Sequence, residues 1–380
     1  MKPLQDILVL DLSQFLSGPS CSLRLADLGA RVIKIEKPKT GDICRQHYVS
    51  NVIMNGTSSL FNAINRNKES FSLDLKLQTD KEKLRKLIKK ADVFIHNFRP
   101  GVIDRLGFDY ERVKAINPNI IYGEISGYGK EGPWKSKAGQ DLLLQALSGL
   151  TQLSGNAKDG PIPLGLAVVD LLAGAHMAQG LLGCLIRRNK TKKGGLVEVS
   201  MLESILEFQF ESITTYFHDG GQATERTSSN NAHAYLGAPY GIYQTQNGYL
   251  ALAMGAIPDL GKILGCSALD QYTATESWYN QRDEIKALLA DHLLGHTTEY
   301  WLQLLEPADF WCANVLNWKQ LFDTEAFQVL EMIQKVSMSD GYTYDTTRCP
   351  ITINEEYLRS ALGAPILDEH NKRIVEEFEL

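Results

Sequence analysis

The first 36 residues alternate between short apolar runs and an amphipathic segment, and this alternation constrains the fold strongly. "DILVLDLS" (6–13) is an apolar run that ends at a polar turn, which predicts a buried strand. "SGPSCSLRLADLGA" (17–30) has apolar residues at Leu23, Leu25 and Leu28 and a stop signal at Gly29, which predicts a helix. "RVIKIE" (31–36) predicts a second strand. A strand, a helix and a strand in so short a span form a βαβ unit and require a parallel sheet.

The same alternation continues to about residue 130. We expect strands at 70–76, 92–98 and 120–126, and helices at 79–91 and 109–117, the first of them capped by Thr79 or Asp80. Helices dominate 141–189, and a strand at 194–201 leads into one long helix at 202–220. The fold class is therefore α/β, with a doubly wound parallel sheet.

The pattern changes after Gly220. A polar, irregular stretch precedes "YGIYQTQNGYLALAMG" (240–255), which predicts a β-hairpin with Asn247-Gly248 as its turn. Helices follow over about 259–305, and the tail from residue 310 begins extended and ends helical. A second, smaller domain is expected here.

Composition excludes several classes of function. The 380 residues carry a net charge of −6, which argues against nucleic acid as a partner. We expect no signal peptide and no membrane-spanning segment. Six scattered cysteines without a CxxC pair suggest free thiols in a reducing cytoplasm. His292 and His296 lack the glutamate of a zinc motif, so no metal site is predicted.

Several polar residues follow the predicted strands, at the edge where doubly wound sheets bind ligands. The loop "SQFLSGPS" lacks both GxGxxG and a P-loop. Positive charge near this edge suits a phosphorylated nucleotide, although solvated loops explain the same pattern equally well. The polar residues in question are Glu36, Lys37, Lys39, Asn97, Arg99 and Arg105.

One carboxylate, Asp170, lies within the apolar stretch "PLGLAVVDLLAGAHMAQG" (163–180). Two interpretations are compatible with the residues. Asp170 caps the helix that follows, or it is a poorly hydrated carboxylate nucleophile. Local physical chemistry alone favours the cap.

Longer segments give a more specific indication. They include "LDLSQFLSGPSCSLRLADLGARVIKIEKPKTGD", "ADVFIHNFRPGVIDRLGFDYERVKAINPNIIYGEISGYGKEGPW", "VVDLLAGAHMAQGLLGCLIRRNKTKKGGLVEVSMLES" and "RCPITINE". With these segments in this order, the chain resembles the class III CoA-transferases, the CaiB–BaiF family that includes formyl-CoA:oxalate and carnitine CoA-transferases. The resemblance extends from Leu10 to the C-terminus.

The resemblance implies an architecture. A Rossmann-like large domain would comprise residues 1–215 and 325–380, and a small domain would comprise 216–324. Two subunits would interlock like rings of a chain. The expected location is the cytoplasm.

The resemblance also implies a reaction. Asp170 matches the catalytic aspartate that attacks an acyl-CoA thioester, passing through a mixed anhydride and an aspartyl-CoA thioester. The substrates would be an acyl-CoA and a small carboxylic or dicarboxylic acid, with no permanently bound cofactor. Ala173, Gly174 and Ala175 would let CoA and the partner subunit approach closely.

Further site residues follow from the same resemblance. The expected CoA contacts are Lys37, Leu73, Asn97, Phe98, Arg99, Arg105, Leu106 and Lys137. The residues expected near the transferred acyl group are Leu16, Gln140 and Gly255. Leu16 replaces a glutamine of formyl-CoA transferases, and "MGAIPD" around Gly255 is not a run of glycines.

Two alternatives stay open within this resemblance. The related 2-methylacyl-CoA racemases use a histidine where this chain has Gln140, and glutamine cannot exchange protons as a base. A non-catalytic CoA-binding protein is the other alternative. Without the resemblance, an NAD-binding enzyme or a plain nucleotide-binding module would also fit the βαβ pattern.

Overall fold

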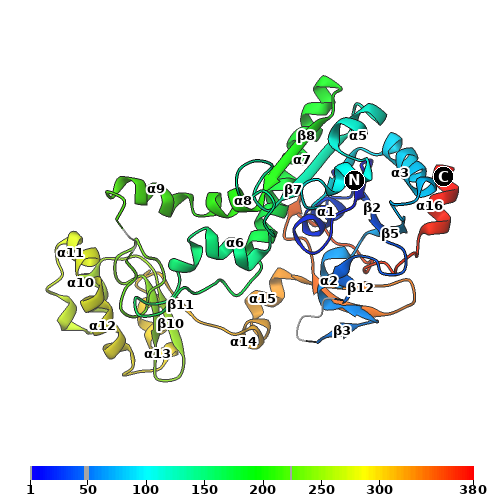
Figure 1. Cartoon of the computed structure of the whole chain (residues 1–380). Helices are drawn as coiled ribbons and strands as arrows, with labels where there is room; N and C mark the ends of the chain where they lie inside the picture. The colour runs from blue at the N-terminus through cyan, green and yellow to red at the C-terminus, as the bar shows by residue number, and fades with distance from the viewer. Residues whose placement is uncertain (1, 47–50, 223–224) are drawn as a thin grey trace. The chain divides into compact units, whose positions relative to one another are not determined.

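The chain divides into two compact units, shown in the computed structural model of Figure 1, which describes residues 2–46, 51–222 and 225–380. The first unit comprises Met1–Leu144, Ala167–Phe208 and Val329–Leu380, and the second comprises Gln145–Leu166 and Gln209–Gln328. The large unit is thus discontinuous in sequence. The second unit includes Gln145–Leu166, which the expected small domain of 216–324 leaves out, and those expected boundaries stay a prediction.

The first unit is built on a six-stranded parallel sheet with the strand order β5-β2-β1-β6-β7-β8. The predicted parallel sheet is confirmed. The strand order reverses between β1 and β6, so the ends of these two strands form the switch point where ligands bind in such sheets. The strands are β1 (Leu8–Asp11), β2 (Arg31–Glu36), β5 (Glu69–Ser72), β6 (Val93–His96), β7 (Ile121–Ser126) and β8 (Gly195–Ser200).

Helices cover both faces of this sheet. On one face, α3 (Gln78–Lys90) and α5 (Tyr110–Ile116) bury Leu84, Leu87 and Val113 in a common apolar cluster with strand residues. The C-terminal helix α16 (Asn371–Phe378) adds to the same cluster and lies beside β5 and α3 (Figure 1). On the other face, α1 (Ser17–Asp27) packs against β1, and the long helix α7 (Val168–Thr191) packs against β7 and β8.

The remaining elements of the first unit are short. They are β3 (Ile53–Met54), β4 (Thr57–Ser58), α2 (Ser59–Asn65), α4 (Val102–Leu106), α8 (Met201–Phe208), α15 (Glu325–Leu330, which spans the boundary between the units), β12 (Ile333–Ser337), β13 (Thr343–Thr347), β14 (Thr352–Ile353) and β15 (Glu356–Tyr357). Helix α6 (Asp141–Leu147) spans another of the four points where the chain passes between the units.

The second unit contains a three-stranded antiparallel sheet in the order β11-β10-β9. Its core joins these strands to the surrounding helices through residues such as Tyr243, Leu250 and Trp301. Its elements are α9 (Phe210–His218), β9 (Gly241–Gln244), β10 (Tyr249–Leu252), α10 (Ile257–Leu264), α11 (Thr275–Asn280), α12 (Arg282–Leu293), α13 (Thr298–Leu305), β11 (Cys312–Asn314) and α14 (Trp318–Phe322).

Three local predictions were wrong. The helix expected over 202–220 is interrupted at Gln209 (φ −96°, ψ 15°), where the two units divide. The hairpin itself is confirmed by the antiparallel pairing of β9 and β10, with Asn247 and Gly248 in its connection, but the two-residue turn was wrong. The connection has four residues, and neither Asn247 nor Gly248 has the positive φ of an Asn-Gly turn. Helix α3 has Leu77 rather than Thr79 or Asp80 before its first residue.

Helix α7 is the one helix of the described residues that could span a membrane by length and composition. It lies here as a core helix against β7, β8 and α1. Gly174 faces α1, because a Cβ atom there would lie 2.1 Å from Ser20 Oγ and 2.6 Å from the carbonyl oxygen of Ser17. The small side chain at this position therefore serves the contact between two helices of the same subunit, a role that the sequence interpretation did not assign to it.

This close contact predicts the effect of Gly174→Ala. The added methyl group must push α1 away from α7, so we expect the free energy of unfolding to fall by about 1–3 kcal/mol. Gly183→Ala on the same helix is the matched control, since its Cβ meets nothing within 4 Å. The control should be stabilised by up to about 1 kcal/mol through helix propensity. Urea unfolding of both variants checks the prediction, and equal stability changes would contradict it.

Candidate active site

The loops after β1 and β6 meet at the switch point of the sheet. Asn97, directly after β6, accepts a hydrogen bond from the backbone N–H of Gln14 at 2.8 Å. Its amide nitrogen donates to the carbonyl oxygen of Gln14 at 2.7 Å and to Ser17 Oγ at 3.1 Å. The loop that leads into α1 is therefore held by a side chain from the neighbouring strand.

Buried charged side chains also hold the loop that leads into α1. Lys34 donates to the carbonyl oxygen of Ser13 at 2.8 Å and pairs with Asp42 at the same distance. Asp42 also accepts a hydrogen bond from the backbone N–H of Phe15 at 3.3 Å. Phe15 has a φ of +60°, a strained conformation for an aromatic residue that these contacts stabilise.

Asp11 is the anionic centre beneath this loop. It accepts hydrogen bonds from Ser13 N and Ser22 Oγ and pairs with Lys68 at 3.2 Å. Burial by itself would raise the pKa of Asp11, but Lys34 and Lys68 outweigh it and lower the pKa to about 2. The carboxylate stays charged at any physiological pH, so the loop keeps its support.

Asp170 lies in the first turn of α7 but does not cap it. The residue before the helix is Ala167, and Asp141 supplies the cap: its Oδ2 accepts from Val169 N at 2.7 Å and from Asp170 N at 3.1 Å. The interpretation of Asp170 as a helix cap was therefore wrong. A carboxylate from another helix satisfies the backbone, which leaves the Asp170 side chain available.

The surroundings of Asp170 favour a reactive carboxylate. Burial raises its pKa to about 6, and the negative charge of Asp141 adds to the increase. Hydrogen bonds from the hydroxyl and the backbone N–H of Ser17 act in the opposite direction. Ser17 is the first residue of α1, so Asp170 also faces the positive end of that helix.

A cavity of about 190 Å³ opens at the same edge of the sheet, and four of the expected CoA contacts line it. These are Lys37, Leu73, Phe98 and Leu106. Glu36, singled out at this edge by the sequence analysis, also lines it, and six other lining residues were missed, namely Leu12, Gln14, Ile35, Asp74, Leu75 and Lys76. Most of them directly follow a strand of the sheet, and this position is the signal that could have identified them.

The other expected CoA contacts lie outside this lining. Arg99 and Arg105 are exposed on the loop after β6 and on α4. Lys137 is exposed on the segment after β7, with its ammonium group 5.0 Å from the centre of the Trp134 ring. Asn97 holds the loop after β1, as described above.

The residues expected near the acyl group lie on three different segments of the chain. Leu16 immediately precedes α1 and packs against a buried cluster that contains Cys44 and Phe61. Gln140 is exposed just before α6. Gly255 belongs to the second unit, where a Cβ atom would lie 2.4 Å from the Phe310 ring. The first unit thus groups Asp170 with Ser17 and Asp141, and sequence reasoning had not selected these two neighbours.

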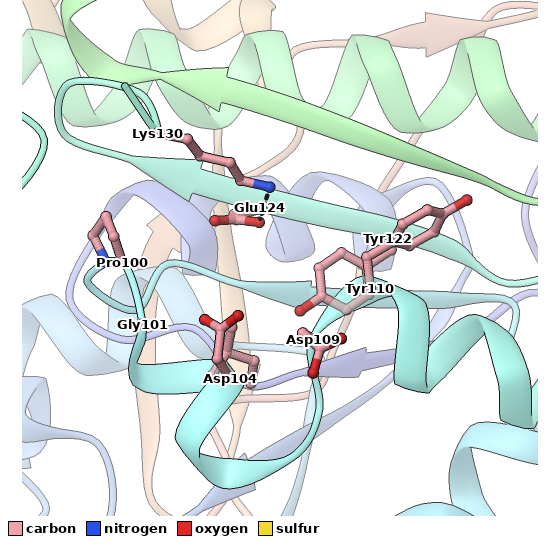
Figure 2. Close-up of a pocket in the computed structure, with 9 residues that line it drawn as sticks. Pro100, Gly101, Asp104, Asp109, Tyr110, Tyr122, Glu124 and Lys130 are labelled. Carbon is pink, nitrogen blue, oxygen red and sulfur yellow. Dashed lines mark ion pairs between the residues drawn. The ribbon is translucent and has the colours of Figure 1, made fainter. Parts of the chain in front are cut away.

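A second cavity of about 190 Å³ has a different charge (Figure 2). Asp104, Asp109 and Glu124 line it together with Lys130, whose ammonium group lies 3.0 Å from Glu124 Oε2. This excess of carboxylates repels phosphate groups. A cavity of about 550 Å³ in the second unit, beside Tyr240 and Trp311, has no charged residue in its described lining. Of these three cavities, the one at Lys37 is therefore the best suited to a phosphorylated ligand.

Comparison with known proteins agrees with this geometry. Residues 4–371 match the model of CoA-transferase family III. The chain belongs to this family. It is 32% identical over 387 aligned positions to acetyl-CoA:oxalate CoA-transferase of Acetobacter aceti, covering 99% of this chain and 96% of the relative.

Two further matches cover the whole chain. Succinyl-CoA:mesaconate CoA-transferase of Haloarcula marismortui is 30% identical over 393 aligned positions, with 99% of this chain and 96% of the relative covered. The crystal structure of a CaiB/BaiF family protein from Brucella suis superposes with a TM-score of 0.85 at 28% identity, covering 99% of both chains. The resemblance inferred from the sequence segments is confirmed, and the chain is an enzyme of the CoA-transferase type.

The raised pKa of Asp170 predicts that the side chain destabilises the free protein. In the folded state Asp170 has a pKa of about 6, whereas the ordinary pKa of an aspartate is 3.8, so stability falls as pH rises between these values. Asp170→Asn should therefore raise the free energy of unfolding by about 1–3 kcal/mol above pH 7 and by little near pH 4. Urea unfolding across this range is the measurement, with Asp259→Asn on exposed α10 as the control. A gain that does not depend on pH would contradict the assignment.

Proposed function

We propose that this enzyme transfers CoA from an acyl-CoA to a small carboxylic or dicarboxylic acid, with Asp170 as the nucleophile. The main supporting observation is that Asp141, rather than Asp170, caps the start of α7, which leaves the Asp170 carboxylate available. A carboxylate with a pKa of about 6 is mostly ionised at neutral pH and more basic than an ordinary aspartate. It is therefore both available and more nucleophilic.

The reaction proceeds in four displacements, and in each of them one bond forms and one bond breaks. An Asp170 oxygen attacks the thioester carbonyl carbon, the C–S bond breaks, and CoA leaves as a thiolate from a mixed anhydride. The thiolate then attacks the Asp170 carbonyl carbon, which releases the donor acid and leaves an aspartyl-CoA thioester. The acceptor carboxylate attacks this thioester and forms a second anhydride. The returning thiolate attacks the acceptor's acyl carbon, which yields the new acyl-CoA and frees Asp170.

Ser17 and α1 contribute electrostatic stabilisation to these steps. Each displacement passes through a tetrahedral intermediate with an anionic oxygen. The backbone N–H of Ser17, which already contacts Asp170, and the positive end of α1 are available to that oxygen. Burial of Asp170 restricts water, which would otherwise hydrolyse the anhydride.

The cavity at the ends of β1, β2 and β5 supplies a site for the nucleotide portion of CoA. Leu73, Phe98 and Leu106 offer apolar walls suited to a purine ring, and Lys37 and Lys76 supply positive charge for phosphate groups. Arg99, Arg105 and Lys137 are proposed as further phosphate contacts, because all three are exposed cations.

The proposed class of acceptor acid is based on the acids that appear in the names of the relatives. Their names pair acetyl-CoA with oxalate and succinyl-CoA with mesaconate. We propose an acid of this size for the present enzyme. The racemase alternative is not favoured, because Gln140 cannot act as a base and the relatives named above are transferases.

We also propose a cytoplasmic, interlocked homodimer with no permanently bound cofactor. Exposed apolar side chains support an extensive subunit contact. Phe210 and Phe217 on α9 are 67% and 71% exposed. Exposure of large apolar groups on this scale is typical of surfaces that another chain covers.

Trapping of the acyl-enzyme tests the nucleophile. Incubation with an acyl-CoA and hydroxylamine should convert Asp170 to a hydroxamate, which mass spectrometry detects on the peptide that contains this residue. Asp170→Ala should lose the modification and at least about 10³-fold in kcat. An exposed substitution on α12, Asp291→Ala, serves as the control.

Two outcomes would contradict the proposal. One is retained transfer activity in Asp170→Ala. The other is exchange of the α-proton of a 2-methylacyl-CoA without CoA transfer, which would indicate a racemase.

The nucleotide site predicts a separation of kinetic constants. Lys37→Ala should raise KM for the acyl-CoA about 5–10-fold with little change in kcat, because the lost phosphate contact is the same in the ground and transition states. Lys89→Ala, an exposed lysine on α3, should leave both constants unchanged. Steady-state kinetics at fixed acceptor concentration decides this, and a fall in kcat alone would place Lys37 elsewhere in the reaction.

A further inference from the structure

Asn97 has its amide group fixed in one orientation. Its oxygen accepts from the backbone N–H of Gln14, and its nitrogen donates to the carbonyl oxygen of the same residue. Rotation of the amide by 180° would place donor against donor and acceptor against acceptor. The nitrogen is therefore the atom that faces Ser17 Oγ at 3.1 Å.

This orientation determines what the Ser17 hydroxyl can do. A serine hydroxyl has one proton to donate and two lone pairs that accept. Because Asn97 donates to Ser17 Oγ, the oxygen is an acceptor on that side. Its single proton is left for the neighbouring Asp170 carboxylate. Ser17 lies against α7 one turn from Asp170, since a Cβ atom at Gly174 would lie 2.6 Å from the Ser17 carbonyl oxygen, and the Ser17 hydroxyl lowers the pKa of Asp170.

We propose that Asn97 is a positioning residue for the transfer reaction, because it directs the Ser17 hydroxyl toward Asp170. The proposal rests on Asp170 as the nucleophile and gives Asn97 a role beyond that of a CoA contact. Asn97 acts through Ser17, which in turn contacts the reacting carboxylate.

The loop itself does not depend on Asn97 alone. Lys34 holds the carbonyl oxygen of Ser13, and Asp42 holds the backbone N–H of Phe15. The close contact at Gly174 keeps Ser17 against α7. A substitution at Asn97 can therefore change the direction of the hydroxyl while the backbone stays in place.

Among the residues that the structure describes, the other titratable groups that interact electrostatically with Asp170 are Asp141, which raises its pKa, and Cys44, whose own pKa is raised in part by Asp170. Both are unchanged by a substitution at Asn97. The hydrogen bond from Ser17 lowers the pKa of Asp170, so its loss must move that pKa above about 6.

Asn97→Asp is the informative variant. One oxygen of the new carboxylate still accepts from the backbone N–H of Gln14. The other replaces the amide nitrogen, so it loses the hydrogen bond to the Gln14 carbonyl oxygen and accepts the Ser17 proton, which turns that proton away from Asp170. The acid limb of kcat/KM against pH should move up by about one unit. KM for the acyl-CoA should change little, because the nucleotide cavity is intact.

A double-mutant cycle separates the effect of the Ser17 hydroxyl direction from the effect of the new charge at position 97. The new negative charge also raises the pKa of Asp170 through space, and this part persists when Ser17→Ala is combined with Asn97→Asp. The part due to the hydroxyl disappears in the Ser17→Ala background. We therefore expect a clearly smaller shift there. If Asn97→Asp does not fold, Asn97→Ala replaces it in the same cycle, with a roughly tenfold fall in kcat expected only where Ser17 is present.

Asn117→Asp is the matched control. Asn117 also clamps backbone, donating to the carbonyl oxygens of Ile88 and Ala91 and accepting from Asn119 N. Its substitution should cost stability without moving the acid limb. This comparison separates a positioning role from a structural one.

A titration independent of turnover completes the test. With ¹³C in the aspartate carboxyl groups, the Asp170 signal is identified by its loss in Asp170→Asn, and its pKa is followed by NMR in wild type and Asn97→Asp. Absence of CoA transfer in the wild type would defeat the proposed function, yet the titration would still decide the role of Asn97. The inference is overturned by an unshifted Asp170, by equal shifts with and without Ser17, or by a rise in KM alone.

Discussion

The packing of α1 on α7 at Gly174 is the contact on which the site depends. Gly174 lies one helical turn after Asp170, so the closest approach of the two helices falls beside the nucleophile. The same contact brings Ser17, and with it the start of α1, to the Asp170 carboxylate. Beneath α7, Gly123 of β7 lies so close to Met177 that a Cβ atom would approach its sulfur to 2.8 Å. The helix is thus fixed from two sides, and the nucleophile with it.

Four aspartate carboxylates near the site have different roles, because their charges have different partners. Asp11 and Asp42 are buried and paired with lysines, which gives the loop before α1 a rigid base. Asp141 satisfies the backbone at the start of α7. No cation is among the causes that shift the pKa of Asp170, and burial and the charge of Asp141 raise it. The cost of burying that charge is therefore concentrated at the residue that reacts.

Local sequence predicted the sheet well and the site incompletely. The alternation of apolar runs with amphipathic segments reports burial, which is a local property, so the strands and most helices were predictable. The cap of α7 was not predictable, because it is supplied by Asp141, which lies 29 residues before Asp170 in the chain. From the local sequence, Asp170 itself could have capped the helix. Asn97 was selected for its position after a strand, yet its contacts are with the loop of another strand. Long-range hydrogen bonds of this kind leave no periodic signal.

The geometry also explains why one carboxylate can serve a reaction that forms and breaks the same bond repeatedly. A strongly paired aspartate would attack poorly, and a fully desolvated one would stay protonated at neutral pH. Asp170 lies between these limits, because burial and Asp141 raise its pKa while Ser17 lowers it. The anhydride and the aspartyl-CoA thioester are both neutral at this side chain, so burial favours them over the free carboxylate. The same burial that destabilises the resting enzyme thus stabilises its covalent intermediates.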